Sequence, residues 1–155
     1  MNVLITGATG GLGEALVKQF ASCGHSIFIT GRSKKKLSDL EDFIKRRYNT
    51  QIKSFPCDLK KDKEIEKLID VCSRWNGGIQ CLINSAAIFD VKAIEEVTIQ
   101  DFDDCFALNV RAPFILSNLL FSKGNLKQII NIGSSSAYAG FKNTTLYCAS
   151  KHALL

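Results

Sequence analysis

The residues of this 155-residue chain best suited to acid–base chemistry are Tyr147 and Lys151. They lie four positions apart, so a helix would place both side chains on the same face. A tyrosine ordinarily ionises at about pH 10, and a neighbouring lysine cation favours its phenolate form. Tyr147 could therefore act as a general acid or a general base at a carbonyl or an alcohol. Taken alone, the two residues also fit an ordinary pair on a helix surface.

A second stretch could hold a phosphate group, Thr6-Gly7-Ala8-Thr9-Gly10-Gly11-Leu12-Gly13. It follows the apolar run 3–5 and precedes apolar residues at helical spacing. A strand, a glycine loop and a helix in this order present backbone N–H groups at a helix N-terminus, where a pyrophosphate binds. Glycines suit the loop because a side chain would hold the phosphate away from the backbone. The alternative is an ordinary turn, because glycine spacing alone is a weak signal.

The elements that must position these residues can be predicted from apolar periodicity. Strands are expected at residues 2–6, 26–30, 51–55, 80–84 and 128–132. Helices are expected at residues 12–22, 34–48, 61–75 and 98–121, with a last helix starting near residue 145. Alternation of strands and helices predicts an α/β fold, a doubly wound parallel sheet with strand order 3-2-1-4-5 and helices on both faces.

A ligand of such a sheet is expected beside the carboxyl ends of the strands. The five predicted strand exits are all rich in glycine, serine, asparagine or aspartate, at residues 7–13, 31–33, 57–59, 84–87 and 134–136. Loops are often small and polar for other reasons. Because all five exits fall on one edge of the sheet, a ligand cleft is the better interpretation.

The composition of the chain argues against several classes of partner and site. The length predicts one domain, residues 1–155, and the net charge of +5 is modest. The basic runs 34–36 and 45–47 are interpreted as solvated helix faces, without the interleaved aromatic residues of a nucleic-acid site. The six cysteines form no C-x-x-C motif and none lies at metal-ligand spacing from the two histidines. We therefore expect no metal, no disulfide, no nucleic acid and a reducing, cytoplasmic location. No membrane partner is expected either, because no apolar run approaches the roughly 18 residues of a membrane span.

These motifs, in this order, resemble those of the short-chain dehydrogenase/reductase family, and the resemblance covers the whole chain. It implies a Rossmann-like, three-layer α/β/α domain that binds NAD(P). Ser134 lies 13 residues before Tyr147, the interval usual in the family. The other matching positions are the glycine loop, Asp58, the stretch Asn84-Ser85-Ala86-Ala87, Asn109 and the Tyr147-x-x-x-Lys151 pair.

The resemblance also implies roles. Hydride passes between a nicotinamide and a carbonyl or alcohol substrate, with Tyr147 as general acid or base and Ser134 holding the substrate oxygen. Lys151 also holds the ribose hydroxyls. The resemblance makes Asn109 the fourth catalytic residue. Pro113 has no N–H to donate to the Asn109 carbonyl, and the resemblance implies that a proton-relaying water binds there instead. The alternative is a plain proline kink in the helix. The cofactor-binding residues are expected to be Thr6, Gly7, Thr9, Gly10, Gly11, Leu12, Gly13, Arg32, Ser33, Asp58, Leu59, Asn84, Ser85 and Ala86, together with Tyr147 and Lys151.

The end of the second strand indicates which cofactor is used. An enzyme that grips the 2′-hydroxyl of NAD places an acidic residue there, whereas this chain has Gly31 followed by Arg32 and Ser33. A guanidinium is a charged, forked donor that suits a 2′-phosphate. We therefore predict NADP rather than NAD. The alternative is that Arg32 is an ordinary solvated side chain.

Three departures from the family pattern leave alternatives open. Ser85 and Ala87 replace an asparagine and a glycine. The glycine spacing also fits the extended, epimerase-like branch, although Asn109 and the serine–tyrosine interval favour the compact one. The chain also stops four residues after Lys151, earlier than is usual in the family. The domain is therefore predicted to be incomplete at its C-terminus. The alternative function is a catalytically incompetent nucleotide-binding module, and the resemblance allows a homo-oligomer.

Overall fold

The computed structural model describes residues 1–155. Five strands form one parallel sheet in the order β3-β2-β1-β4-β5, as the sequence predicts. The strands are β1 (Asn2–Thr6), β2 (Ser26–Gly31), β3 (Ile52–Pro56), β4 (Cys81–Asn84) and β5 (Gln128–Asn131). The α-helices are α1 (Gly11–Ser22), α2 (Lys34–Arg47), α3 (Asp62–Ser73), α4 (Ile99–Phe106), α5 (Ala112–Ser122) and α6 (Thr145–Leu154).

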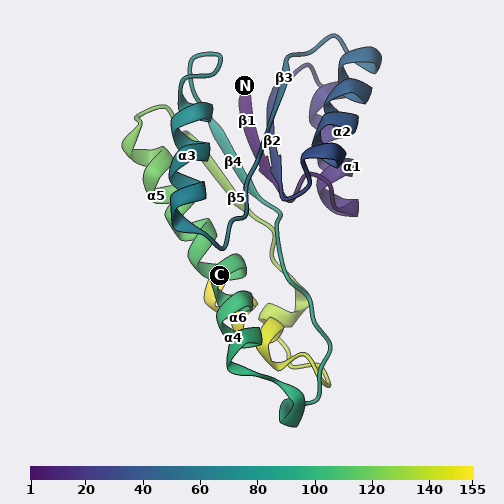
Figure 1. The fold of residues 1–155 in the computed structure, drawn as a ribbon, viewed down its shortest axis with the longest axis vertical. Helices are drawn as coiled ribbons and strands as arrows, with labels where there is room; N and C mark the ends of the chain where they lie inside the picture. The colour runs from purple at the N-terminus through teal and green to yellow at the C-terminus, as the bar shows by residue number, and fades with distance from the viewer.

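Each face of the sheet is covered by helices because both sets of alternating strand side chains are apolar. Val3 and Ile5 point to one face and pack with residues of α1 and α2. Leu4, Phe28 and Leu82 point to the other face and pack with residues of α3 and α5. Figure 1 shows these two layers, with α1 and α2 on one side and α3 and α5 on the other. Burying each such large apolar side chain contributes about 1.5–3 kcal/mol.

The helix predicted at residues 98–121 is divided by a π-helical turn, Ala107–Arg111, between α4 and α5. In this turn the N–H of Ala112 donates to the carbonyl of Ala107, five residues earlier. Pro113 follows directly and supplies no N–H, so the regular α-helical ladder cannot continue through it. The helix therefore contains a turn with one extra residue rather than the plain proline kink that was the alternative interpretation of Pro113.

The segment Ile99–Ser122 is long and apolar enough to cross a membrane by length and composition alone. Its residues Ala112, Leu116 and Leu120 are buried against α3 and the sheet. We interpret the segment as a core helix on this side, whereas Phe114 and Phe121 are 70 % and 74 % exposed.

The strand β5 forms one edge of the sheet, pairing with β4 alone. The side chain of Ile129 is 43 % exposed, whereas Ile130 and the following Ile132 pack against the core on the α1–α2 side. An edge strand presents unpaired backbone groups, which makes it a surface open to association. The segments that carry α4 and α6 extend beyond the carboxyl end of β5 (Figure 1).

Candidate active site and cofactor cleft

The glycine loop is built so that two of its positions accept no side chain. Gly7 has φ +64°, and a Cβ there would lie 2.8 Å from the Cα of Ala86. A Cβ on Gly13 would lie 2.1 Å from the carbonyl oxygen of Gly7. Gly7 thus lets the loop meet the segment after β4, and Gly13 lets α1 begin directly against the loop.

The start of α1 is open towards an anion. The residue before the helix is Gly10, so no side chain caps the first N–H groups. A Cβ on Gly11 would meet nothing within 4 Å. An uncapped helix N-terminus bordered by open space fits a diphosphate, which accepts hydrogen bonds from backbone N–H groups.

Beside this loop lies a cavity of about 340 Å³, formed by the exits of β1, β2, β3 and β4. Of the predicted cofactor residues, those that line it are Gly7, Thr9, Gly10, Arg32, Asp58, Leu59, Ser85 and Ala86. Those that do not line it are Thr6, Gly11, Leu12, Gly13, Ser33, Asn84, Tyr147 and Lys151. Lining residues that the sequence reasoning missed include Lys36, Lys60, Ile88 and Leu108. Lys36 lies in the first turn of α2, which begins two residues after Arg32, and this closeness along the chain could have indicated its position.

Several predicted residues outside the cavity hold its walls instead. The hydroxyl of Thr6 donates to the carbonyl of Ile83 and accepts from the N–H groups of Ser85 and Ala86, at 3.0 and 3.1 Å. This places the segment after β4 against the glycine loop. The hydroxyl of Ser33 caps α2 by accepting from the N–H of Lys36.

Asn84 turns away from the cavity. Its Nδ2 donates to Oδ1 of Asn131 on the neighbouring strand at 2.8 Å, and its own Oδ1 is buried without a partner. The contact joins the carboxyl ends of β4 and β5. Asn84 is thus placed to hold the sheet edge together rather than to line the cleft.

One corner of the cavity is basic. Arg32 and Lys36 are both exposed, and neither forms an ion pair with a carboxylate. The first turn of α2 holds no acidic residue, so its lysines oppose the positive end of the helix dipole. An anion bound in this corner would relieve that repulsion.

The candidate catalytic helix is α6, which carries Tyr147 and Lys151. The Lys151 side chain is buried, and its Nζ donates to the carbonyl of Ile132 at 2.6 Å. Burial lowers the pKa of Lys151. The Nζ lies 5.7 Å from the ring centroid of Tyr147, and the ring of Phe89 meets the same tyrosine edge-on at 4.7 Å. The two predicted residues therefore do share one helix face.

The side chain of Asn109 connects the cavity beside the glycine loop with the helix α6. Its Nδ2 donates to the carbonyl of Ile88 at 3.0 Å and to the hydroxyl of Ser150 at 2.9 Å, and its Oδ1 accepts from the N–H of Ile88. Ile88 lines the cavity, and Ser150 precedes Lys151 on α6. Sequence reasoning considered the Asn109 carbonyl but not these side-chain contacts.

Ser134 stands at the exit of β5. Its hydroxyl accepts from the N–H of Ser136 at 3.1 Å, which starts a short 3₁₀ turn, Ser135–Ala137. That turn packs against α6, the helix of Tyr147. Ser134 is therefore delivered to the same end of the sheet as the tyrosine helix.

A glycine-opened helix, a cleft at the ends of parallel strands and a tyrosine–lysine helix beside it define a nucleotide-binding oxidoreductase fold. The family model for short chain dehydrogenases matches residues 1–155, and the chain belongs to this family.

Named relatives show how broad that family is. The chain is 29 % identical over 156 residues to galactitol 2-dehydrogenase of Agrobacterium fabrum, covering 98 % of this chain and 59 % of the relative. It is 33 % identical over 155 residues to 3-oxoacyl-(acyl-carrier-protein) reductase FabG of Rickettsia typhi, covering 98 % and 61 %. A metagenomic short-chain oxidoreductase solved in complex with NADP superposes with a TM-score of 0.92 at 25 % identity, covering 99 % of this chain and 71 % of that one. The chain thus spans about three fifths of the length of these curated relatives.

Proposed function

We propose that the protein binds NADP(H) and transfers hydride between the nicotinamide and a carbonyl or alcohol substrate. The observation that carries the proposal is the cavity of about 340 Å³ beside the glycine loop, with a basic corner at Arg32 and Lys36. The NADP bound by a structural neighbour supports the choice of cofactor. The named relatives act on unlike substrates, so the substrate class stays at carbonyl or alcohol.

Different residues of the chain bind different parts of NADP(H) in this proposal. The N–H groups that open α1 hold the diphosphate, and the Arg32 guanidinium holds the 2′-phosphate as a forked, charged donor. The loop of Asp58 and Leu59 forms the opposite wall of the cavity, where the resemblance places the adenine ring. Bound NADPH supplies the hydride.

Tyr147 handles the proton in this proposal. The buried Lys151 spends one of its N–H groups on the Ile132 carbonyl and keeps two for ribose hydroxyls. The Tyr147 hydroxyl gives its proton to the carbonyl oxygen during reduction, and the Lys151 ammonium lies 5.7 Å from the centre of the same ring. Ser134 orients the substrate oxygen from the neighbouring strand exit. The position of the Lys151 ammonium is fixed by its hydrogen bond to the Ile132 carbonyl.

The experiment is a fluorescence titration with NADPH and with NADH, followed by turnover of a panel of ketones and aldehydes measured by NADPH absorbance. We expect tighter binding of NADPH and measurable oxidation of it. A Tyr147→Phe variant should bind NADPH as the wild type does and lose turnover. Absence of NADPH binding by the folded wild type would overturn the proposal.

A nucleotide-binding module without catalysis is the second candidate. The chain spans about three fifths of its relatives, and β5 has no neighbour on one side. Tight NADPH binding without turnover of any substrate would favour this candidate.

We further propose a homo-oligomer and a cytoplasmic location. A groove of about 900 Å³ runs along α4, α5 and α6, lined by the apolar side chains of Phe106, Val110 and Phe114 among others. Light scattering on the wild type and on Phe114→Glu tests whether this face joins two copies; a monomeric wild type would contradict it. All six cysteines are free, which supports a reducing compartment.

A further inference from the structure

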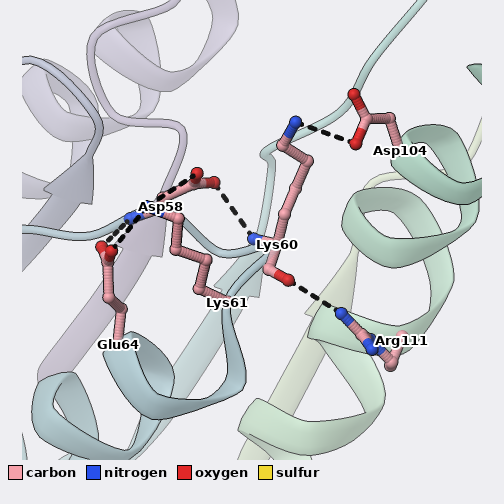
Figure 2. A network of polar contacts seen from close by, with 6 residues as sticks. All are labelled: Asp58, Lys60, Lys61, Glu64, Asp104 and Arg111. Carbon is pink, nitrogen blue, oxygen red and sulfur yellow. Dashed lines mark hydrogen bonds and ion pairs between the residues drawn. The ribbon is translucent and has the colours of Figure 1, made fainter. Parts of the chain in front are cut away.

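The wall of the cavity that carries Asp58 is a loop, residues 57–61, between β3 and α3. Two internal bonds shape it. The Lys60 N–H donates to Oδ1 of Asp58 at 3.2 Å, and the Asp58 N–H donates to Oε2 of Glu64 at 2.8 Å. These bonds fold the loop onto the start of α3 (Figure 2). They do not fix its distance from the rest of the cavity, because both partners belong to the same segment.

The start of the loop is anchored to β2 by the Cys57 N–H, which donates to the Gly31 carbonyl, whereas Lys60 is held from the other side by residues of α4 and the π-helical turn. Nη2 of Arg111 donates to the Lys60 carbonyl at 2.8 Å and lies 3.3 Å from Oδ1 of Asp62. The Lys60 ammonium pairs with Asp104 at 2.9 Å. Figure 2 shows Arg111 and Asp104 reaching the main chain and the side chain of Lys60 from the neighbouring helical segment. The loop is therefore held at Lys60 by two independent contacts.

The same π-helical turn holds the catalytic end of the site. Asn109 and Arg111 are two residues apart, so their side chains leave the helix on nearly opposite sides. Asn109 contacts Ile88 and Ser150, and Arg111 contacts Lys60. One turn thus fixes the cavity wall of Asp58 on one side and the helix of Tyr147 on the other.

We propose that Arg111 is a positioning residue for the cofactor, which holds the 57–61 loop at the spacing that the adenosine end of NADP(H) requires. The inference rests on the proposed function. Arginine suits the task because one terminal nitrogen serves a backbone carbonyl and a carboxylate together. Arg111 itself does not line the cavity of the glycine loop, so its effect passes through the loop.

The test compares Arg111→Met with the wild type, using NADPH and adenosine 2′,5′-bisphosphate in calorimetric titrations. Methionine keeps much of the aliphatic stem and removes both contacts. We expect both dissociation constants to rise roughly three- to ten-fold. The expected rise is modest because Arg111 is partly exposed, and solvent weakens its ion pair. The matched control is Lys123→Met, which removes a similarly exposed ion pair with Asp70 away from the cavity. The control should leave both constants unchanged.

Hydrogen exchange of the ligand-free protein supplies a readout that does not depend on the cofactor. In Arg111→Met the Lys60 amide should exchange faster, whereas the amides of α6 should not change. Asp104→Asn acts on the same loop through the Lys60 side chain and should weaken NADPH binding in the same direction, which covers a failure of Arg111→Met to fold.

The outcomes separate the two ideas. If the wild type binds NADPH and Arg111→Met binds it equally well, the positioning role is overturned and the proposed function stands. If the folded wild type binds neither ligand, the proposed function falls and this inference falls with it. If Arg111→Met and Asp104→Asn both bind NADPH more weakly than the wild type, and the Lys123→Met control binds it unchanged, the positioning role is established.

Discussion

Replacing Gly13 by alanine tests whether the glycine loop is built as the structure shows. The added Cβ would lie 2.1 Å from the oxygen and 2.8 Å from the carbon of the Gly7 carbonyl, and 2.9 Å from the Cα of Ala8. Cβ atoms essentially never approach other atoms within 3.0 Å, so α1 and the loop must separate by about 1 Å. Every clashing atom is backbone, so no side-chain rotation relieves the contact. Overpacking of this kind costs about 3 kcal/mol, and the better helix propensity of alanine returns at most about 1 kcal/mol.

We therefore expect Gly13→Ala to lose about 2 kcal/mol of unfolding free energy in urea titrations followed by circular dichroism. For a chain of this length that loss lowers the melting temperature by about 4–8 °C. Gly11→Ala is the matched control, because its Cβ meets nothing within 4 Å, and it should unfold at the wild-type urea concentration or slightly above it. A Gly13→Ala variant as stable as the wild type would show that the loop yields freely and would refute the steric reasoning.

Three other predictions concern charge and chemistry. Arg32→Ala should weaken NADPH binding by about tenfold while leaving NADH binding unchanged, with Lys35→Ala as the control; equal losses for both cofactors would contradict the 2′-phosphate contact. Tyr147→Phe should lower turnover by at least about 100-fold at unchanged NADPH affinity, and retained turnover would remove Tyr147 from the chemistry. Hydrogen bonding from Lys92 and the α4 cap lowers the pKa of Asp101 from 3.8 to about 2. The stability it adds is present above pH 3.8 and lost as pH falls through about 2, so the destabilisation by Asp101→Asn should shrink over that interval; a pH-independent difference would contradict the assignment.

The sheet and its strand order could be predicted because each strand is a short apolar run separated from the next by a helical pattern. Right-handed crossovers then leave few arrangements. The same argument placed the strand exits on one edge, and the exits of β1, β2, β3 and β4 do meet in one cavity. Local patterns were sufficient here, because the walls of the cavity are the loops that directly follow the strands.

Contacts between distant segments could not be predicted. Asn109 contacts Ile88 and Ser150, which are 21 and 41 residues away. These contacts are made by its side chain and not by its carbonyl, and they depend on the direction in which the π-helical turn points that side chain. One extra residue in a helix leaves no periodic signal in so short a span. Asn84 was assigned to the cofactor by its motif, yet its orientation depends on Asn131 of the neighbouring strand.

The two ends of the site therefore depend on different parts of the fold. The proposed cofactor cavity is enclosed by loops that follow the four strands whose side chains form both apolar cores, and its 57–61 wall is held in addition by Arg111 at Lys60. The helix α6 is instead held by Asn109 at Ser150 and by the Ile132 carbonyl at Lys151, and Ile132 follows the edge strand β5. An edge strand is paired on one side only and opens more easily than a central one. Disturbance at this edge should consequently misplace Lys151 before it affects the loops around the cavity, so under the proposed function turnover should fall before the affinity for the adenosine end of NADP(H).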